Sequence, residues 1–138
     1  MTSQLQGRTP FTVSTRRFRT VALVRVAGEL DLATAPTLRA HLRAATAPSA
    51  SSVLILDLSG VTFCDSVGLS ELIVALQHSQ NRGKRLVLSG VPASLDDLLY
   101  RTGLHKILER RATCDEALRH VRETRHAHSA GHDRRRPA

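Results

Sequence analysis

The sequence predicts a single α/β domain with a mixed, mostly parallel sheet of about five strands and about four helices. Strand and helix patterns alternate along most of the chain, which indicates crossover units between parallel strands. The run Val53–Leu58 is almost continuously apolar, as is typical of a strand covered on both faces. The first two strand patterns follow each other without a helix between them, so we expect them to form an antiparallel edge. A length of 138 residues fits one domain.

The strand patterns are short apolar runs rich in valine, isoleucine and leucine. The second run is followed by Gly28, which we expect to end that strand. The expected strands cover residues 11–17, 21–26, 53–58 and 85–89, with a last short strand at Ile107 and Leu108.

The helix patterns follow helical spacing and recognisable ends. Residues 32–45 carry Leu38 and Leu42 four apart, and residues 66–81 carry an apolar stripe. A third helix runs from a Ser94 cap to Tyr100, and Thr113 with Glu116 forms a capping box that opens the last one. Two glycines are expected just beyond helix ends, Gly83 and Gly103. The stripe of the second helix consists of Leu69, Leu72, Ile73 and Leu76.

The positive charge of the chain is concentrated at its ends. The net charge is +8, of which residues 1–20 carry +4, residues 122–138 carry +3 and residues 21–121 only +1. Terminal arginines of this kind are usually solvated, and the chain has few aromatic residues to stack nucleic-acid bases. We therefore predict a flexible arm over residues 1–10, a domain over 11–124, a disordered His- and Arg-rich tail over 125–138, and no direct nucleic-acid binding.

The two cysteines and the hydropathy indicate a cytoplasmic protein. Cys64 and Cys114 lie in a chain large enough to fold without disulfides, which suits a reducing compartment. Met1 is followed by polar residues rather than by a signal peptide. No apolar run approaches the roughly 20 residues needed to span a bilayer, so no membrane association is expected.

The segment Phe63–Ser70 is the most informative one for function. It connects the central strand to the second helix, at the sheet edge where α/β proteins bind ligands and partners. Asp65 or Ser66 can cap that helix, which is an ordinary structural role. Alternatively, a phosphate on Ser66 would be favoured by the helix N-terminus and would add charge beside Asp65.

Two catalytic interpretations find less support. Ser66 between a strand and a helix loosely resembles a hydrolase nucleophile elbow, but Cys64 stands where that motif has its first glycine.

The second interpretation is a Mg²⁺ site, because four carboxylates near strand ends could gather around the ion, although no phosphate-binding loop accompanies them. These carboxylates belong to Glu29, Asp31, Asp57 and Asp65. His126, His128 and His132 lack cysteine partners and are read as part of the tail. We expect neither a metal nor a cofactor.

The second helix also offers a face for a partner protein. With the leucine stripe inward, Val67 and Val74 would lie two turns apart on the outer side, together with Ser70 and Glu71. Apolar anchors flanked by polar groups are typical of docking helices. The alternative is that neighbouring helices cover Val74.

These motifs together resemble the STAS domain family, and more narrowly its bacterial anti-sigma factor antagonists. The likeness covers roughly residues 11–121. It rests on segments that occur in the family's order and spacing: Gly28–Asp31, Val53–Leu58, Phe63–Leu69, Gly83–Val91, Thr102–Leu104 and Ile107.

The resemblance implies a protein that binds an anti-sigma factor, often also a serine kinase, and so frees a sigma factor for transcription. It further implies that the kinase inactivates the antagonist by phosphorylating a hydroxyl at the start of the second helix, and that a phosphatase reverses this. The usual acceptor position is occupied here by Val67, so Ser66 becomes the candidate, and constitutive activity is the alternative. The expected partner-binding residues are Asp31, Asp65, Ser66, Val67, Gly68, Ser70, Glu71 and Val74. A second function of another class is a STAS scaffold or sensor that binds other regulatory proteins or a small ligand.

Overall fold

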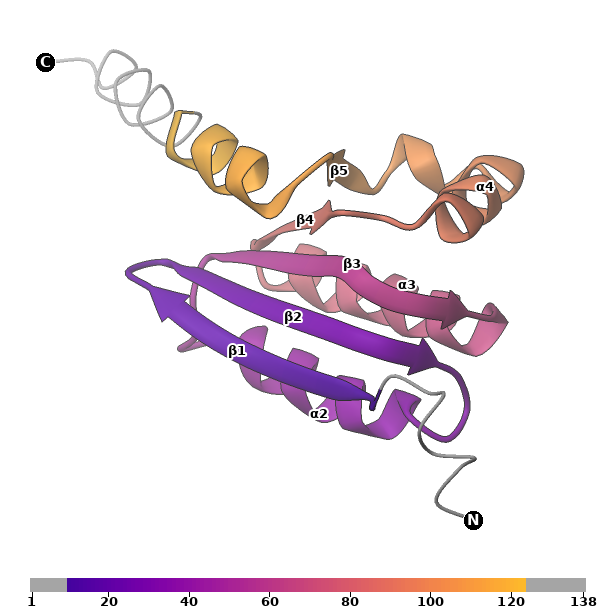
Figure 1. Ribbon diagram of the computed structural model, residues 1–138. Helices are drawn as coiled ribbons and strands as arrows, with labels where there is room; N and C mark the ends of the chain where they lie inside the picture. The colour runs from indigo at the N-terminus through magenta and orange to yellow at the C-terminus, as the bar shows by residue number, and fades with distance from the viewer. Residues whose placement is uncertain (1–9, 124–138) are drawn as a thin grey trace, which may run out of the picture.

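The computed structural model describes residues 10–123 and shows a five-stranded sheet with helices on both faces (Figure 1). Strands β1 (Thr12–Phe18) and β2 (Val21–Leu30) form the antiparallel edge pair. The sheet continues in sequence order through β3 (Val53–Cys64), β4 (Arg85–Ser89) and β5 (Glu109–Arg111), and all of these pairings are parallel. The predicted α/β class and the mixed, mostly parallel sheet are confirmed.

One face of the sheet is covered by the three crossover helices. These are α2 (Ala35–Ala45), α3 (Ser66–Asn81) and α4 (Ala93–Thr102). Because consecutive strands are neighbours and crossovers share one hand, successive helices fall on the same face. Their leucines, such as Leu38 and Leu72, join alternate residues of the strands in one large apolar core.

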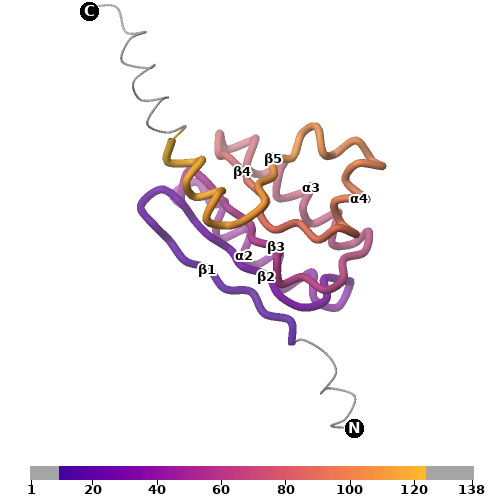
Figure 2. Tube along the Cα trace, turned by 45° about the horizontal axis from the view of Figure 1, so that its top comes forward, coloured from indigo at the N-terminus to yellow at the C-terminus, as the bar shows by residue number. Residues whose placement is uncertain are grey.

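The opposite face is covered by the last helix, residues 114–123 within the described part of the chain. Figure 2 shows it on the side of the sheet away from α2 and α3. Ala117 and Val121 pack there against the other alternate strand residues, which include Leu23 and Ile55. Both faces of the central strands are therefore buried, which explains their continuous apolar runs. As predicted, Thr113 caps this helix, since its hydroxyl accepts a hydrogen bond from the Glu116 amide at 3.1 Å.

Two strands extend further than predicted. β2 continues through Gly28 to Leu30, and β3 continues beyond Leu58 to Cys64, because the two extensions pair with each other. Gly28 has a φ of +99°, and a Cβ there would come within 2.9 Å of the Phe11 backbone, so this position requires glycine without ending the strand.

Other boundaries also differ from the prediction, among them those of β1, which is shifted by one residue to Thr12–Phe18, and of α4, which ends at Thr102 rather than Tyr100. The first helix begins at Ala35 rather than at residue 32, because the preceding residues form a turn. α4 begins at Ala93 with Pro92 as its N-cap, so Ser94 is not the cap. The last strand is Glu109–Arg111 rather than Ile107 and Leu108, and residues 104–106 form a short 3₁₀ helix.

α3 and β4 match their predicted ranges, and Gly83 and Gly103 follow helix ends with positive φ. The expectations for the N-terminal arm and the tail fall on residues 1–9 and 124–138, which lie outside the described residues.

Candidate functional site

The carboxyl edge of the sheet brings the ends of β2 and β3 side by side. Leu30 and Cys64, the last residues of these strands, are register partners. The arrowheads of both strands point to the side of Figure 1 on which α2 and α3 begin. Asp31 and Asp65 therefore occupy equivalent positions, each directly after its strand.

Asp65 is the N-cap of α3. Its backbone is extended, and its Oδ1 accepts hydrogen bonds from the amides of Val67 at 2.9 Å and Gly68 at 3.2 Å. These bonds satisfy two amides that have no partner within the helix. Of the two caps that the sequence allowed, the structure has Asp65.

Ser66 is the first residue of α3 and is exposed. Its side chain lies at the positive end of the helix, where a phosphate is electrostatically favoured. Ser70, one turn later, is also exposed, and its hydroxyl donates to the Ser66 carbonyl at 2.9 Å. Of these two hydroxyls, Ser66 is the one at the helix N-terminus.

Asp31 organises the neighbouring turn in the same way. Its Oδ1 accepts hydrogen bonds from the amides of Ala33 at 3.0 Å and Thr34 at 3.2 Å. The Thr34 hydroxyl in turn donates to the Glu29 carbonyl at 2.7 Å. The loop that follows β2 is thus held in a fixed shape beside the start of α3.

Two of the predicted contact residues are not on the surface. Gly68 is buried, and a Cβ there would lie 2.5 Å from the Cys64 sulfur and 2.8 Å from Leu30 Cγ. Its role is to let α3 approach the sheet. Glu71 is only 6% exposed, so its predicted outward position is wrong.

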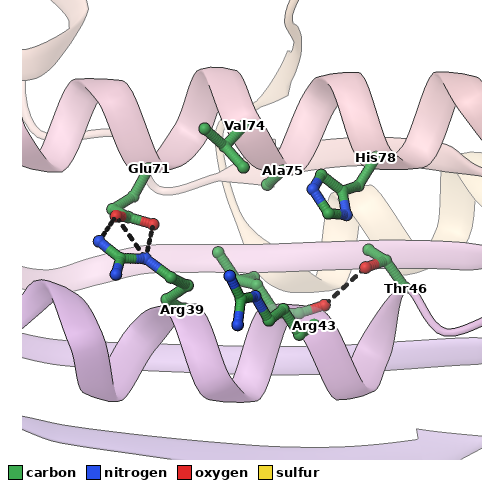
Figure 3. A pocket seen from close by; sticks show the side chains of 8 residues that line it. Arg39, Arg43, Thr46, Glu71, Val74, Ala75 and His78 are labelled. Carbon is green, nitrogen blue, oxygen red and sulfur yellow. Dashed lines mark hydrogen bonds and ion pairs between the residues drawn. The ribbon is translucent and has the colours of Figure 1, made fainter.

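The carboxylate of Glu71 faces α2 and pairs with Arg39. The guanidinium donates to Oε1 from Nε at 3.0 Å and from its terminal nitrogen at 2.5 Å (Figure 3). The hydrogen bonds and the charge of Glu71 raise the pKa of Arg39 above its ordinary value. This bridge ties the two helices that flank the site.

The remaining predicted face of α3 is open. Val74 is 40% exposed, so neighbouring helices do not cover it, and Val67 is half-buried. Ile73, expected in the buried stripe, is only partly buried at the border of the core.

Two large exposed side chains at this edge were not predicted. Leu32 is 75% exposed and lies in the turn after β2, and Phe63 is 51% exposed near the end of β3. The signal in the sequence was that each lies within two residues of an aspartate that follows a strand.

The edge is also acidic. Residues 29–34 and 59–67 contain Glu29, Asp31 and Asp65 but no lysine, arginine or histidine, in a chain whose net charge is +8. The same surface therefore combines carboxylates with apolar side chains that project into solvent.

The structure does not support a Mg²⁺ site made from the four carboxylates. Among residues 10–123 no group of three or more potential ligands is placed to hold a metal ion. The Oδ2 atom of Asp57 instead lies 3.5 Å from Nε of Arg25, and the Asp57 carboxylate accepts a hydrogen bond from the Ser59 amide at 3.1 Å.

Burial, together with the charge of Asp65, raises the pKa of Cys64 to about 11, so its thiol is protonated at neutral pH.

Within residues 10–123, no helix is long and apolar enough to cross a bilayer.

Comparison with known families decides the relationship, because the STAS domain model matches residues 12–117. The chain belongs to the STAS domain family. The anti-sigma-B factor antagonist of Listeria monocytogenes is 37% identical over 84 residues, which cover 61% of this chain and 73% of that protein.

Solved STAS structures have the same fold. An anti-sigma factor antagonist from Mycobacterium paratuberculosis is 31% identical with a TM-score of 0.73, over 82% of this chain and 95% of that one. The Bacillus cell fate determinant SpoIIAA in its phosphorylated form is 22% identical with a TM-score of 0.66, over 81% and 99% of the two chains. This second likeness concerns the fold alone.

Proposed function

We propose that this STAS protein is a cytoplasmic anti-sigma factor antagonist that binds an anti-sigma factor of the serine-kinase type and so frees a sigma factor. It acts by binding and not as an enzyme. The observation that carries the proposal is the open carboxyl edge, where Phe63 and Leu32 project near the turn-forming Asp31 and the helix cap Asp65. The similarity to anti-sigma factor antagonists names the class of partner.

The chemistry of this edge specifies the surface that it fits. Exposed aromatic and aliphatic side chains serve as anchors when a partner provides apolar pockets. The carboxylates of Asp31 and Asp65 favour arginines or lysines around those pockets and disfavour acidic surfaces. Because the hydrogen bonds of Asp31 and Asp65 and the paired strand ends hold the edge in place, little conformational order has to be gained on binding.

Phosphorylation at Ser66 would interfere with this contact. A phosphoserine carries a charge of about −1.5 to −2 and is strongly hydrated. On Ser66 it would lie at the start of α3, close in sequence to the exposed Phe63 and the half-buried Val67. Apolar contacts at the edge would then require removing water from a dianion. The kinase activity of the partner supplies the phosphate from ATP, and a phosphatase would remove it.

Affinity capture with matched variants tests the binding proposal. The unaltered chain should recover an ATPase-like anti-sigma factor, identified by mass spectrometry, from the cell extract. Phe63→Lys and Val67→Lys should lose it, whereas Ile107→Lys should retain it, because Ile107 is an exposed apolar residue between the 3₁₀ helix and the start of β5. Capture that is equal for all variants would refute the proposed edge.

Incubation with the captured partner and ATP tests the regulation. Phosphate should appear on Ser66 and be lost in Ser66→Ala. Phosphate on Ser70 instead, or no phosphate at all, would contradict the assignment of Ser66, and the second result would indicate a constitutively active antagonist.

The second candidate function is a STAS scaffold or sensor, which Val67 favours because it replaces the usual acceptor hydroxyl. In that case capture would recover other STAS proteins, or a bound small molecule, and no ATPase-like protein. A hydrolase that uses Ser66 would be labelled by a fluorophosphonate probe; no labelling is expected.

A further inference from the structure

A shallow groove runs between α2 and α3, behind the carboxyl edge. Figure 3 shows the Arg39–Glu71 pair at one end of it and His78 with Thr46 toward the other. Leu42 and Ala75, both buried, also line the groove, and Val74 is 40% exposed beside them. The eight lining residues are Arg39, Leu42, Arg43, Thr46, Glu71, Val74, Ala75 and His78.

The charge of this groove is the opposite of that of the edge. Among the described residues, Glu71 is the one carboxylate that lines the groove, and Arg39 neutralises it. Arg43 is exposed, and no acidic side chain among residues 10–123 forms an ion pair with it. At the far end Arg82 donates to the Thr46 carbonyl at 2.7 Å, which places another cation there. The groove therefore presents apolar side chains between arginines.

Charge excludes the chain's own ends as occupants. Residues 1–9 contain Arg8 and no acidic residue, and residues 124–138 contain four arginines and one aspartate. Segments with a net positive charge are repelled by a basic groove. A complementary segment has to come from a molecule with exposed carboxylates.

We infer that the groove between α2 and α3 is a second contact surface for the anti-sigma factor, and that it accepts an amphipathic helix in which an aliphatic side chain is flanked by carboxylates. The aliphatic side chain packs on Val74, and the carboxylates face Arg43 and His78. This inference rests on the proposed function. Continuity supports it: Val67, Ser70 and Val74 are three and four residues apart on α3, so one helix face joins the acidic edge to the basic groove.

The test measures the affinity of the full chain for its purified anti-sigma factor by titration calorimetry. Arg43→Glu combined with His78→Glu should weaken binding at least tenfold. Arg119→Glu should not, although it reverses the charge of an exposed arginine, as Arg43→Glu does, at a position on the last helix. Raising the salt concentration should weaken the unaltered chain more than the double variant, because screening removes an attraction that the variant lacks. Thermal melts establish that all variants fold.

The outcomes separate this inference from the proposed function. If Phe63→Lys weakens binding while the double variant binds like Arg119→Glu, the groove is not a contact surface and the proposed function stands. If the unaltered chain binds no anti-sigma factor, both fail. Self-association of the unaltered chain in sedimentation that disappears in the double variant would identify a second copy as the occupant and overturn the inference.

Discussion

Gly68 lies so close to Cys64 that a Cβ on the glycine would be 2.5 Å from the sulfur. We predict that Gly68→Ala destabilises the fold by about 1–3 kcal/mol, the usual cost of overpacking a core. Urea denaturation measures this, with Ser70→Ala as an exposed control on the same helix. Shortening the neighbour in a Cys64→Ala/Gly68→Ala double variant should restore part of the loss. A double variant that loses the full sum of the single effects would show that this contact is not the cause.

The cap at Asp65 can be separated from its charge. Asp65→Ala removes the acceptor for two amides and should cost about 1 kcal/mol of stability. Asp65→Asn keeps an acceptor oxygen and should cost clearly less, while it removes the negative charge from the edge. Denaturation curves of the two variants test the cap. If binding of the anti-sigma factor then falls in Asp65→Asn, the charge itself contributes to the interface; unchanged binding would contradict the electrostatic argument made for the edge.

The Arg39–Glu71 pair is expected to hold α2 against α3. Arg39→Ala leaves a carboxylate buried without its partner, so the melting temperature should fall by several degrees. Arg43→Ala, one turn along the same helix, removes an exposed arginine that forms no ion pair with an acidic side chain among residues 10–123. The melting temperature should therefore change little. Adding Glu71→Gln to Arg39→Ala removes the unpaired charge and should recover part of the loss. Equal melting temperatures for the two arginine variants would show that the pair contributes nothing.

The Cys64 thiol makes stability depend on pH in the alkaline range. Its pKa in the folded protein is about 11, above the ordinary value of 9.0. Between these values the unfolded chain loses the proton that the folded chain retains, so this contribution to stability is complete below pH 9 and decreases as the pH rises toward 11. The difference in stability between the unaltered chain and Cys64→Ala should therefore shrink over that interval. A constant difference would contradict the raised pKa.

The sequence correctly predicted elements whose stripe and cap residues lie close together along the chain. The range of α3 was correct because its apolar stripe lies within the helix and its aspartate cap lies directly before it. The far ends of β2 and β3 were not predicted, since residues 27–30 and 60–64 are strands because they pair with each other. β5, which has only three residues, likewise depends on its pairing with β4.

The candidate site was predicted in position but only partly in detail. The Asp65–Ser66 turn is at the carboxyl edge as expected, and Val74 is exposed. Glu71 was wrongly predicted to lie on the outer side of α3, because a charged residue beside an apolar stripe is normally solvated. Its partner Arg39 lies 32 residues earlier on another helix, so no local pattern in the sequence indicates the ion pair. Leu32 and Phe63 were missed because exposure at the end of a strand depends on where the covering helices stop.

Hydrogen–deuterium exchange on the complex with the anti-sigma factor locates the docking surface on this chain. If the carboxyl edge is the docking surface, peptides that cover residues 30–34 and 63–70 should gain protection in the complex. Residues 114–123, on the opposite face of the sheet, should exchange as in the free protein. Protection confined to residues 114–123, with the edge unchanged, would show that the partner does not dock at the carboxyl edge.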